Sequence, residues 1–379
     1  MVLTRRAHRA RMVITLWLPN EVLTGIIRCA NKPDQATLCR VSKLFHGLVL
    51  PIINRAISLE CLDKKGRPCE RTLNSFLQSL IRNPERAEAV RSLTFLRQWP
   101  FAPPVDYDLL FEAMELMRNL EFLSFDDILN SEIITRLACL TWPNLSWCRI
   151  EVMCTDGSTA TGFAKFLSQH PSIVRVFLSA VGAPDPLGPG PTFLPNLRHY
   201  NGDPLFLDKL STRSLETARV YVDELRIECD ARALQAASNP NLPFVLSLEY
   251  AALELDNPIQ TILRALSAEF PRIRSLQLRE IETNPLDITA LQHVTAQLPH
   301  FTQIAYFSLT YATPRPKFVV DAQSDDAAFQ TWVAASPTLI GCCIGNVARR
   351  KLGGEWEQVS VDDFDAQAGF SVFELPLDD

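Results

Sequence analysis

Three short stretches near the start of the chain each place their apolar residues on one face of a helix. The first follows Pro19, which suits the first helical position because its missing N–H would have no partner there. Asp34 is a suitable N-cap for the second. The apolar faces consist of Val22, Leu23, Ile26 and Ile27; then Leu38, Val41 and Phe45; then Leu48, Ile52, Ile53 and Ile57. Helices this short cannot bury so much surface among themselves, so the surplus must pack against the rest of the chain or another protein.

A second pattern recurs through the remainder of the chain. The phrase P-x-L-x-x-L-x-L, with aliphatic, aromatic or cysteine substitutes, occurs at 143–150, 171–178, 195–202, 271–278 and 337–344. Shorter or interrupted versions fill the intervals. The first apolar anchors, 18 to 31 residues apart, are Leu120, Leu145, Ile173, Leu197, Leu215, Leu242, Ile273 and Phe301. Such self-similarity is typical of a stack of repeats.

The segments between the anchors have helical spacing, as in 259–266 and 291–298. The pattern predicts an α/β fold in which a short strand, a connection and a helix are stacked repeatedly into a solenoid with a curved parallel sheet. A compact α/β domain with a parallel sheet would show the same alternation and remains the alternative.

Alternate positions of each predicted strand face away from the helices. Arginine and large aromatic residues are over-represented in binding hot spots, and several occupy these positions. The predicted partner-binding residues are Trp147, Arg149, Arg175, Phe177, Arg219, Tyr221 and Arg279. An acidic or phosphorylated partner would suit the arginines. The alternative is that each arginine is simply a solvated side chain.

Charge is unevenly distributed along the 379 residues. The net charge of −6 argues against general nucleic-acid binding. Residues 355–379 contain eight acidic residues and no Lys or Arg, whereas residues 1–14 are basic. We expect a disordered leader at 1–14. We expect 355–379 to cap the final repeat, or alternatively to fold back onto basic positions of the binding surface.

The ten cysteines form no CxxC pair and no Cys/His group with zinc-site spacing, so neither a metal nor a cofactor is expected. No export signal or membrane-spanning run is evident, which excludes a membrane partner and predicts free thiols in the cytoplasm or nucleus. His170 and His300 flank repeat prolines and are expected at the surface of helix ends.

One phrase resembles a catalytic motif. Residues 341–345 read G-C-C-I-G, a cysteine form of a hydrolase nucleophile elbow centred on Cys343. That mechanism needs a histidine later in the chain, and none follows His300. The same residues fit the repeat phrase, so we predict a core strand there and no catalytic residue. A Gly-Pro-Gly-Pro run at 188–191 is expected to form a surface loop.

The first pattern resembles the F-box family. The shared series is Leu18-Pro19, Glu21, Val22-Leu23, Ile26-Ile27, Asp34, Leu38, Val41-Ser42-Lys43 and Phe45. The resemblance implies a three-helix module at 15–60 that binds a Skp-type adaptor and, through it, a cullin. The positions that match the family's adaptor contacts are Leu18, Pro19, Ile26, Leu38, Val41, Lys43 and Phe45. The alternative is an ordinary three-helix part of a larger core.

The region at 71–354, after a linker at 61–70, is similar to leucine-rich-repeat proteins, although the asparagine expected after L-x-L is mostly missing. Together the two resemblances imply the substrate-recognition subunit of an SCF-type ubiquitin ligase, in which the repeats bind an unknown protein. The alternatives are an F-box scaffold that acts outside a ligase, and an enzyme that uses Cys343.

Overall fold

The computed structural model describes residues 18–60, 70–96, 106–153, 157–181, 192–222, 227–250, 258–280, 288–311 and 322–373. The leader at 1–14, the run at 188–191 and nearly all of the linker at 61–70 lie outside these residues, as do residues 374–379 of the acidic segment. The chain divides into two compact units, residues 1–127 with 139–146 and residues 128–138 with 147–379.

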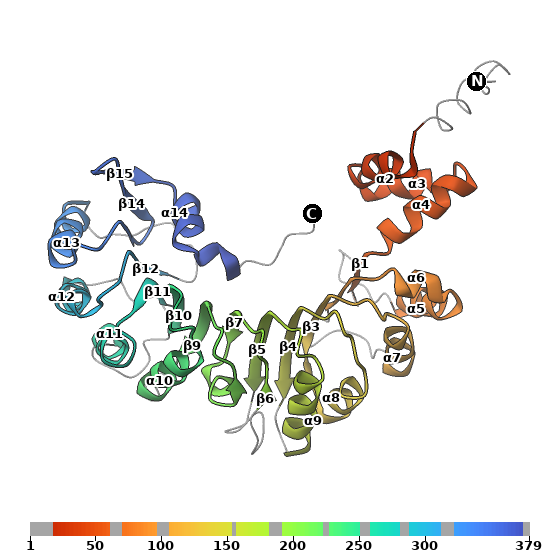
Figure 1. Ribbon diagram of the computed structural model, residues 1–379, viewed down its shortest axis with the longest axis horizontal. Helices are drawn as coiled ribbons and strands as arrows, with labels where there is room; N and C mark the ends of the chain where they lie inside the picture. The colour runs from red at the N-terminus through yellow and green to blue at the C-terminus, as the bar shows by residue number, and fades with distance from the viewer. Residues whose placement is uncertain are drawn as a thin grey trace. The chain divides into compact units, whose positions relative to one another are not determined.

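The first unit begins with three helices, α2 (Asn20–Arg28), α3 (Lys32–Leu38) and α4 (Lys43–Ile53) (Figure 1). Their starts are set by local chemistry. The Asn31 side chain accepts a hydrogen bond from the backbone of Asp34, so Asn31 is the N-cap of α3 and the prediction of Asp34 was wrong by three residues. Ser42 caps α4 in the same way, through the backbone N–H of Phe45.

Three parallel strands with covering helices complete the first unit. The strands are β1 (Ala56–Glu60), β2 (Ser92–Leu96) and β3 (Phe122–Leu129), and the last residues of β3 belong to the second unit. The helices are α5 (Glu70–Arg82), α6 (Pro84–Glu88) and α7 (Tyr107–Glu115). Leu59, Phe95 and Phe125 are aligned across the three strands and are buried.

The second unit contains a sheet whose strands follow one another in sequence order. Its parallel strands are β4 (Trp147–Met153), β5 (Arg175–Val181), β7 (His199–Gly202), β9 (Thr217–Val222), β10 (Phe244–Tyr250), β11 (Ile273–Glu280), β12 (Tyr306–Tyr311) and β13 (Gly341–Ile344). A compact doubly wound domain would reverse its strand order, and neither unit does. The order therefore supports stacked repeats over the compact alternative.

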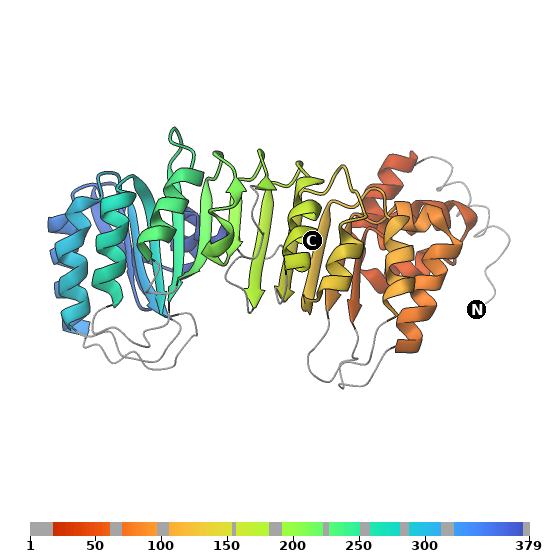
Figure 2. The ribbon, with the colours of Figure 1, turned by 90° about the horizontal axis from the view of Figure 1, so that it is seen from below.

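Helices cover one face of this sheet (Figures 1 and 2). They are α8 (Ser131–Leu137), α9 (Gly157–Ser168), α10 (Ile227–Ala237), α11 (Pro258–Glu269), α12 (Ile288–Gln297) and α13 (Ala322–Ala335). Short elements complete the connections: η1 (Pro204–Phe206), η3 (Leu298–His300), and β6 (Thr192–Phe193) paired with β8 (Leu210–Ser211).

The described part of the second unit finishes with an antiparallel hairpin and a short helical segment. Strand β14 (Val347–Leu352) pairs with β13 and with β15 (Glu355–Val359), and both pairings are antiparallel. Helix α14 (Val361–Ala368) and η4 (Phe370–Phe373) then lie on the sheet face opposite α9–α13 (Figure 1). We call the face opposite α9–α13 the open face.

The repeat anchors form the core with one exception. Leu120, Leu145, Ile173, Leu197, Leu215, Ile273 and Phe301 are buried. Leu242 is 45% exposed, so its prediction as a core anchor was wrong. The Asn239 side chain accepts a hydrogen bond from the backbone of Asn241, and this turn leaves Leu242 outside while Phe244 enters the core.

His170 also departs from its predicted place. It is fully buried rather than at the surface, and its Nδ1 lies 2.7 Å from the carbonyl oxygen of Phe166. Burial lowers its pKa below the usual value. His300 is exposed, as predicted.

Candidate interaction surfaces

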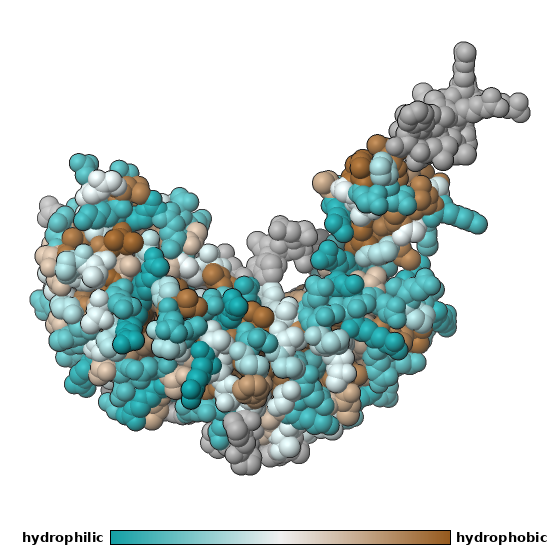
Figure 3. All heavy atoms as spheres, viewed as in Figure 1, coloured by the Kyte–Doolittle hydropathy of each residue, from teal (hydrophilic) through white to brown (hydrophobic). Residues whose placement is uncertain are grey.

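The three N-terminal helices divide their apolar residues between an interior and an exterior. Leu23, Ile27 and Val49 are buried. The exposed large apolar residues of this region are Leu18, Val22, Ile26, Val41 and Leu44, with exposures between 37% and 63%. Brown, apolar surface gathers over α2–α4 in Figure 3. We call these five residues the apolar patch.

The predicted adaptor-binding residues lie on this exterior. Leu18, Pro19, Ile26, Val41 and Lys43 are exposed, and Leu38 and Phe45 are half-buried. A buried glutamine supports the arrangement from inside, because the Gln35 side chain donates to the carbonyl oxygens of Ile27 and Ala30 at 2.9 and 2.8 Å. Those two bonds fix the turn between α2 and α3.

On the open face of the second unit, side chains form rows across the strands. One row follows the register Arg149, Phe177, Asn201, Arg219, Ser247, Gln277. A parallel row runs Trp147, Arg175, His199, Thr217. The alternate residues of β5, Val176 and Leu178, are buried, as the two-residue period of a strand requires.

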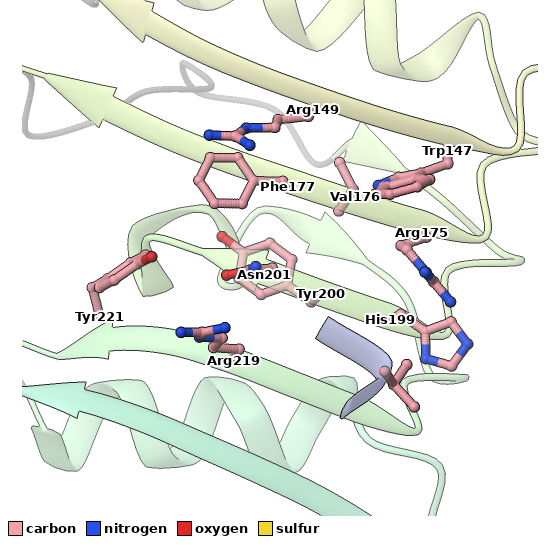
Figure 4. A pocket seen from close by; sticks show the side chains of 11 residues that line it. Trp147, Arg149, Arg175, Val176, Phe177, His199, Tyr200, Asn201, Arg219 and Tyr221 are labelled. Carbon is pink, nitrogen blue, oxygen red and sulfur yellow. The ribbon is translucent and has the colours of Figure 1, made fainter. Parts of the chain in front are cut away.

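These rows enclose a pocket of about 310 Å³ (Figure 4). We call it the arginine–aromatic pocket. It brings together six of the seven predicted partner-binding residues, namely Trp147, Arg149, Arg175, Phe177, Arg219 and Tyr221. Val176, His199, Tyr200, Asn201 and Val372 complete its lining.

Cation–π contacts order two of the arginines. The guanidinium carbon of Arg149 lies 4.8 Å from the centre of the Phe177 ring, and that of Arg175 lies 5.1 Å from the Trp147 ring. Such stacking holds a charged group flat against an aromatic face while its N–H donors stay available at the edge.

The pocket is basic. None of its lining residues is acidic. Burial, then the nearby charges of Arg175 and Arg198, lower the pKa of His199 to about 4, so His199 is neutral near pH 7. Burial also lowers the pKa of Arg175 from its usual value. Among the described residues, no carboxylate lies within ion-pair distance of Arg175.

Sequence analysis missed one residue that organises this face. Glu249 on β10 is 5% exposed, and one of its oxygens accepts hydrogen bonds from Arg219 Nε at 3.0 Å and from Arg279 Nη1 at 2.8 Å. Tyr221 also hydrogen-bonds to Glu249. Arg279, the seventh predicted partner-binding residue, is not part of the pocket lining. It shares the Glu249 carboxylate with Arg219, which lines the pocket. Strand alternation places Glu249, which follows the buried Leu248, at an outward position. The repeat phrase at 240–248 is interrupted, so this position could not be read from it.

A second hollow lies at the carboxyl-terminal end of the unit. It has a volume of about 490 Å³ and includes Phe329, Arg349 and Trp356. Arg349 stacks on Phe329 at 4.6 Å and pairs with Asp326. Because this arginine already has a carboxylate partner, the hollow offers less unbalanced charge than the arginine–aromatic pocket.

The cysteine phrase that resembles a nucleophile elbow is a strand. Residues 341–344 form β13, as predicted, and both Cys342 and Cys343 are buried. Burial raises the pKa of each thiol to about 12, which keeps both protonated near pH 7. Within the described ranges, no group of His, Cys, Asp and Glu could hold a metal ion, and no helix is long and apolar enough to cross a membrane.

No protein-family model matches the sequence, and no curated protein matches it. Among solved structures, the chain is similar to the leucine-rich-repeat-containing protein LegL7 from Legionella pneumophila. The TM-score is 0.42 and the identity 15%, over 76% of this chain and 82% of that chain. The repeat architecture rests on the strand order and register described above.

Proposed function

We propose that this chain is the substrate-recognition subunit of an SCF-type ubiquitin ligase. In this proposal α2–α4 are an F-box that binds a Skp-type adaptor and, through it, a cullin, and the open face binds a protein substrate. The supporting observation is the apolar patch. Three of its residues, Leu18, Ile26 and Val41, match the family's adaptor contacts and stay outside, while Leu23 and Ile27 form the interior. Exposed apolar residues gathered on one small module are typical of a protein-binding site.

Adaptor binding can be tested by titrating the purified chain with a Skp adaptor. Ile26→Asp combined with Val41→Asp should weaken binding at least about 100-fold, because two apolar contacts would be replaced by carboxylates that lose their hydration in the interface. Leu23 is unsuitable for this purpose, since it is buried and Leu23→Asp would unfold the module.

The matched control is Phe193→Asp with Leu242→Asp. These residues are 61% and 45% exposed, similar to Val41 and Ile26, but lie in the second unit. The control should bind the adaptor normally. If the intact, folded chain does not bind the adaptor, the proposal is contradicted.

An F-box scaffold outside a ligase is the second candidate, because the same patch would serve it. It predicts adaptor binding without cullin co-purification. An enzyme using Cys343 finds no support in the geometry of β13. Thiol-directed probes address it directly, since a catalytic Cys343 would react faster than the buried Cys148.

A further inference from the structure

The side chains that line the arginine–aromatic pocket come from two rows on the open face. Arg175 lies in one row, beside Trp147, and Arg149 lies in the other, beside Phe177. Residues two apart on a strand are separated by about 6.6 Å, and this distance also separates the rows. Figure 4 shows the Arg175 side chain directed toward His199 and away from Arg149. The pocket therefore has two basic ends, rather than one point at which its arginines converge.

The end formed by Arg175 carries a charge that the described residues do not balance. Its guanidinium carbon lies 5.1 Å from the centre of the Trp147 ring, and no carboxylate of the described residues lies within ion-pair distance of it. Burial lowers the pKa of Arg175, which means that the charged form has lost hydration without gaining an anion. An anionic group of a ligand would compensate for this loss.

The other end holds two arginines. Arg149 and Arg219 lie in the same row, on either side of Phe177 and Asn201 (Figure 4). The Arg149 guanidinium carbon is 4.8 Å from the centre of the Phe177 ring, which leaves its N–H groups at the edge of the stack. None of the described residues that line the pocket is acidic, so this end also suits an anion.

An extended peptide matches the spacing of the two ends. Its alternate side chains point to the same side and repeat at about 6.6 Å, as those of the strand beneath it do. Carboxylates at positions i and i+2 would meet both ends at once, while residue i+1 faces solvent. Arginine binds such carboxylates through charge-assisted hydrogen bonds. A volume of about 310 Å³ is small for a ligand site, which suits two side chains better than a large molecule.

We propose that the arginine–aromatic pocket binds an extended acidic segment of a partner protein, with two carboxylates that are two residues apart. One carboxylate pairs with Arg175 and the other with Arg149 and Arg219. Their methylene groups pack on Trp147 and Phe177. This inference rests on the proposed role of the open face in binding a protein substrate, and it specifies the class of substrate. It implies that the spacing of the acidic residues sets the affinity, in addition to their charge.

The test uses the full chain and two fluorescein-labelled peptides of identical composition. One is Gly-Ser-Glu-Ser-Glu-Ser-Gly, with spaced acids, and the other is Gly-Ser-Ser-Glu-Glu-Ser-Gly, with adjacent acids. Fluorescence anisotropy should show the spaced peptide binding at least about tenfold more tightly, because only its carboxylates can engage both ends together. Arg175→Gln should reduce the affinity for the spaced peptide to that for the adjacent one, because one end is lost.

Arg264→Gln is the matched control. Arg264 is exposed on helix α11, and its replacement changes the net charge equally. It should leave the affinity for both peptides unchanged. Three results would each overturn the inference: no binding of the spaced peptide by the folded chain, equal affinity for the two peptides, or an unchanged affinity after Arg175→Gln. Adaptor binding through α2–α4 is measured separately, so a chain that binds the adaptor without preferring the spaced peptide contradicts this inference alone.

Discussion

Arg175 and Arg219 both point outward from strands of the open face, yet their surroundings differ. Arg219 is held by Glu249, whereas Arg175 lies on Trp147 with no carboxylate partner among the described residues. The first arginine mainly joins strands together, and the second retains unbalanced charge for a ligand.

Replacing Glu249 should reveal this structural role. Glu249→Gln would leave Arg219 and Arg279 facing each other without their shared carboxylate. We expect the free energy of unfolding to fall by about 2–4 kcal/mol, because the two arginines lose the buried carboxylate that they share. Urea unfolding measures the change. Glu228→Gln, at an exposed ion pair on α10, should change it by less than about 0.5 kcal/mol, and a similar loss in both variants would contradict the assignment.

His199 provides a test of the pocket's charge. Its pKa in the folded chain, about 4, lies below the usual 6.5, so the unfolded chain binds its proton first as the pH falls. This histidine's contribution to stability is therefore present above pH 6.5 and is lost as the pH falls from 6.5 to about 4. An NMR titration should place the midpoint near 4. Arg175→Gln should raise it, and a midpoint of 6.5 in the intact chain would contradict the buried, basic setting.

At the scale of single residues, the sequence predicted which side chains share the open face, because a strand alternates its side chains with a period of two. Trp147, Arg149, Arg175 and Phe177 follow directly from the repeat phrase. Glu249 could not be predicted as their organiser, because its partners Arg219 and Arg279 are 30 residues away on either side and meet it only through strand register.

Among the elements, strand β7 depends on one glycine. Gly202 has a φ of 131°, and a Cβ there would lie 1.8 Å from the carbonyl oxygen of Leu178 on β5. Gly202→Ala should therefore cost about 3 kcal/mol or more, since both the backbone conformation and the strand spacing would be strained. Gly25→Ala in helix α2 meets no neighbouring atom and should instead stabilise the chain by about 0.5–1 kcal/mol.

Thermal unfolding of these two variants gives the comparison. Tm should fall for Gly202→Ala and should not fall for Gly25→Ala. An unchanged Tm for Gly202→Ala would contradict the close approach of β7 to the Leu178 carbonyl oxygen on β5.

Element boundaries were predicted less well than element types. The cap of α3 was misplaced because Asn31 and Asp34 are both good capping residues, and only the backbone path selects Asn31. Leu242 matched the repeat phrase, but a local turn at Asn239 took precedence over the pattern. Gly353-Gly354, a common hairpin signal, marks the turn between β14 and β15, and this turn does not follow from the repeat phrase.

For the molecule as a whole, α14 and η4 seal the open face at the carboxyl-terminal end. Phe364→Ala would remove a fully buried ring that contacts Tyr306. We expect a loss of about 3–5 kcal/mol and faster alkylation of Cys343, measured by mass spectrometry. The exposed Cys229 should react equally in both chains, and an unchanged Cys343 would show that α14 does not protect it.

The repeat stack was predictable because its anchors recur at similar intervals, and neighbouring units must bury one another's apolar faces. The proposed role of α2–α4 rests on a resemblance and on the exposed apolar residues of these helices. Which apolar side chains remain outside depends on how the three helices pack. Composition alone could not show that Ile26 is exposed and Ile27 is buried.

The hairpin β14–β15 has a consequence for self-association. The outermost strand of a sheet offers an unpaired backbone edge onto which the same edge of a second copy could pair. Here β14 runs opposite to β13, β15 runs opposite to β14, and β15 carries the exposed residues Glu355 and Glu357. Two copies approaching through their β15 strands would bring like charges together. Edge-to-edge pairing of two β15 strands is thereby disfavoured.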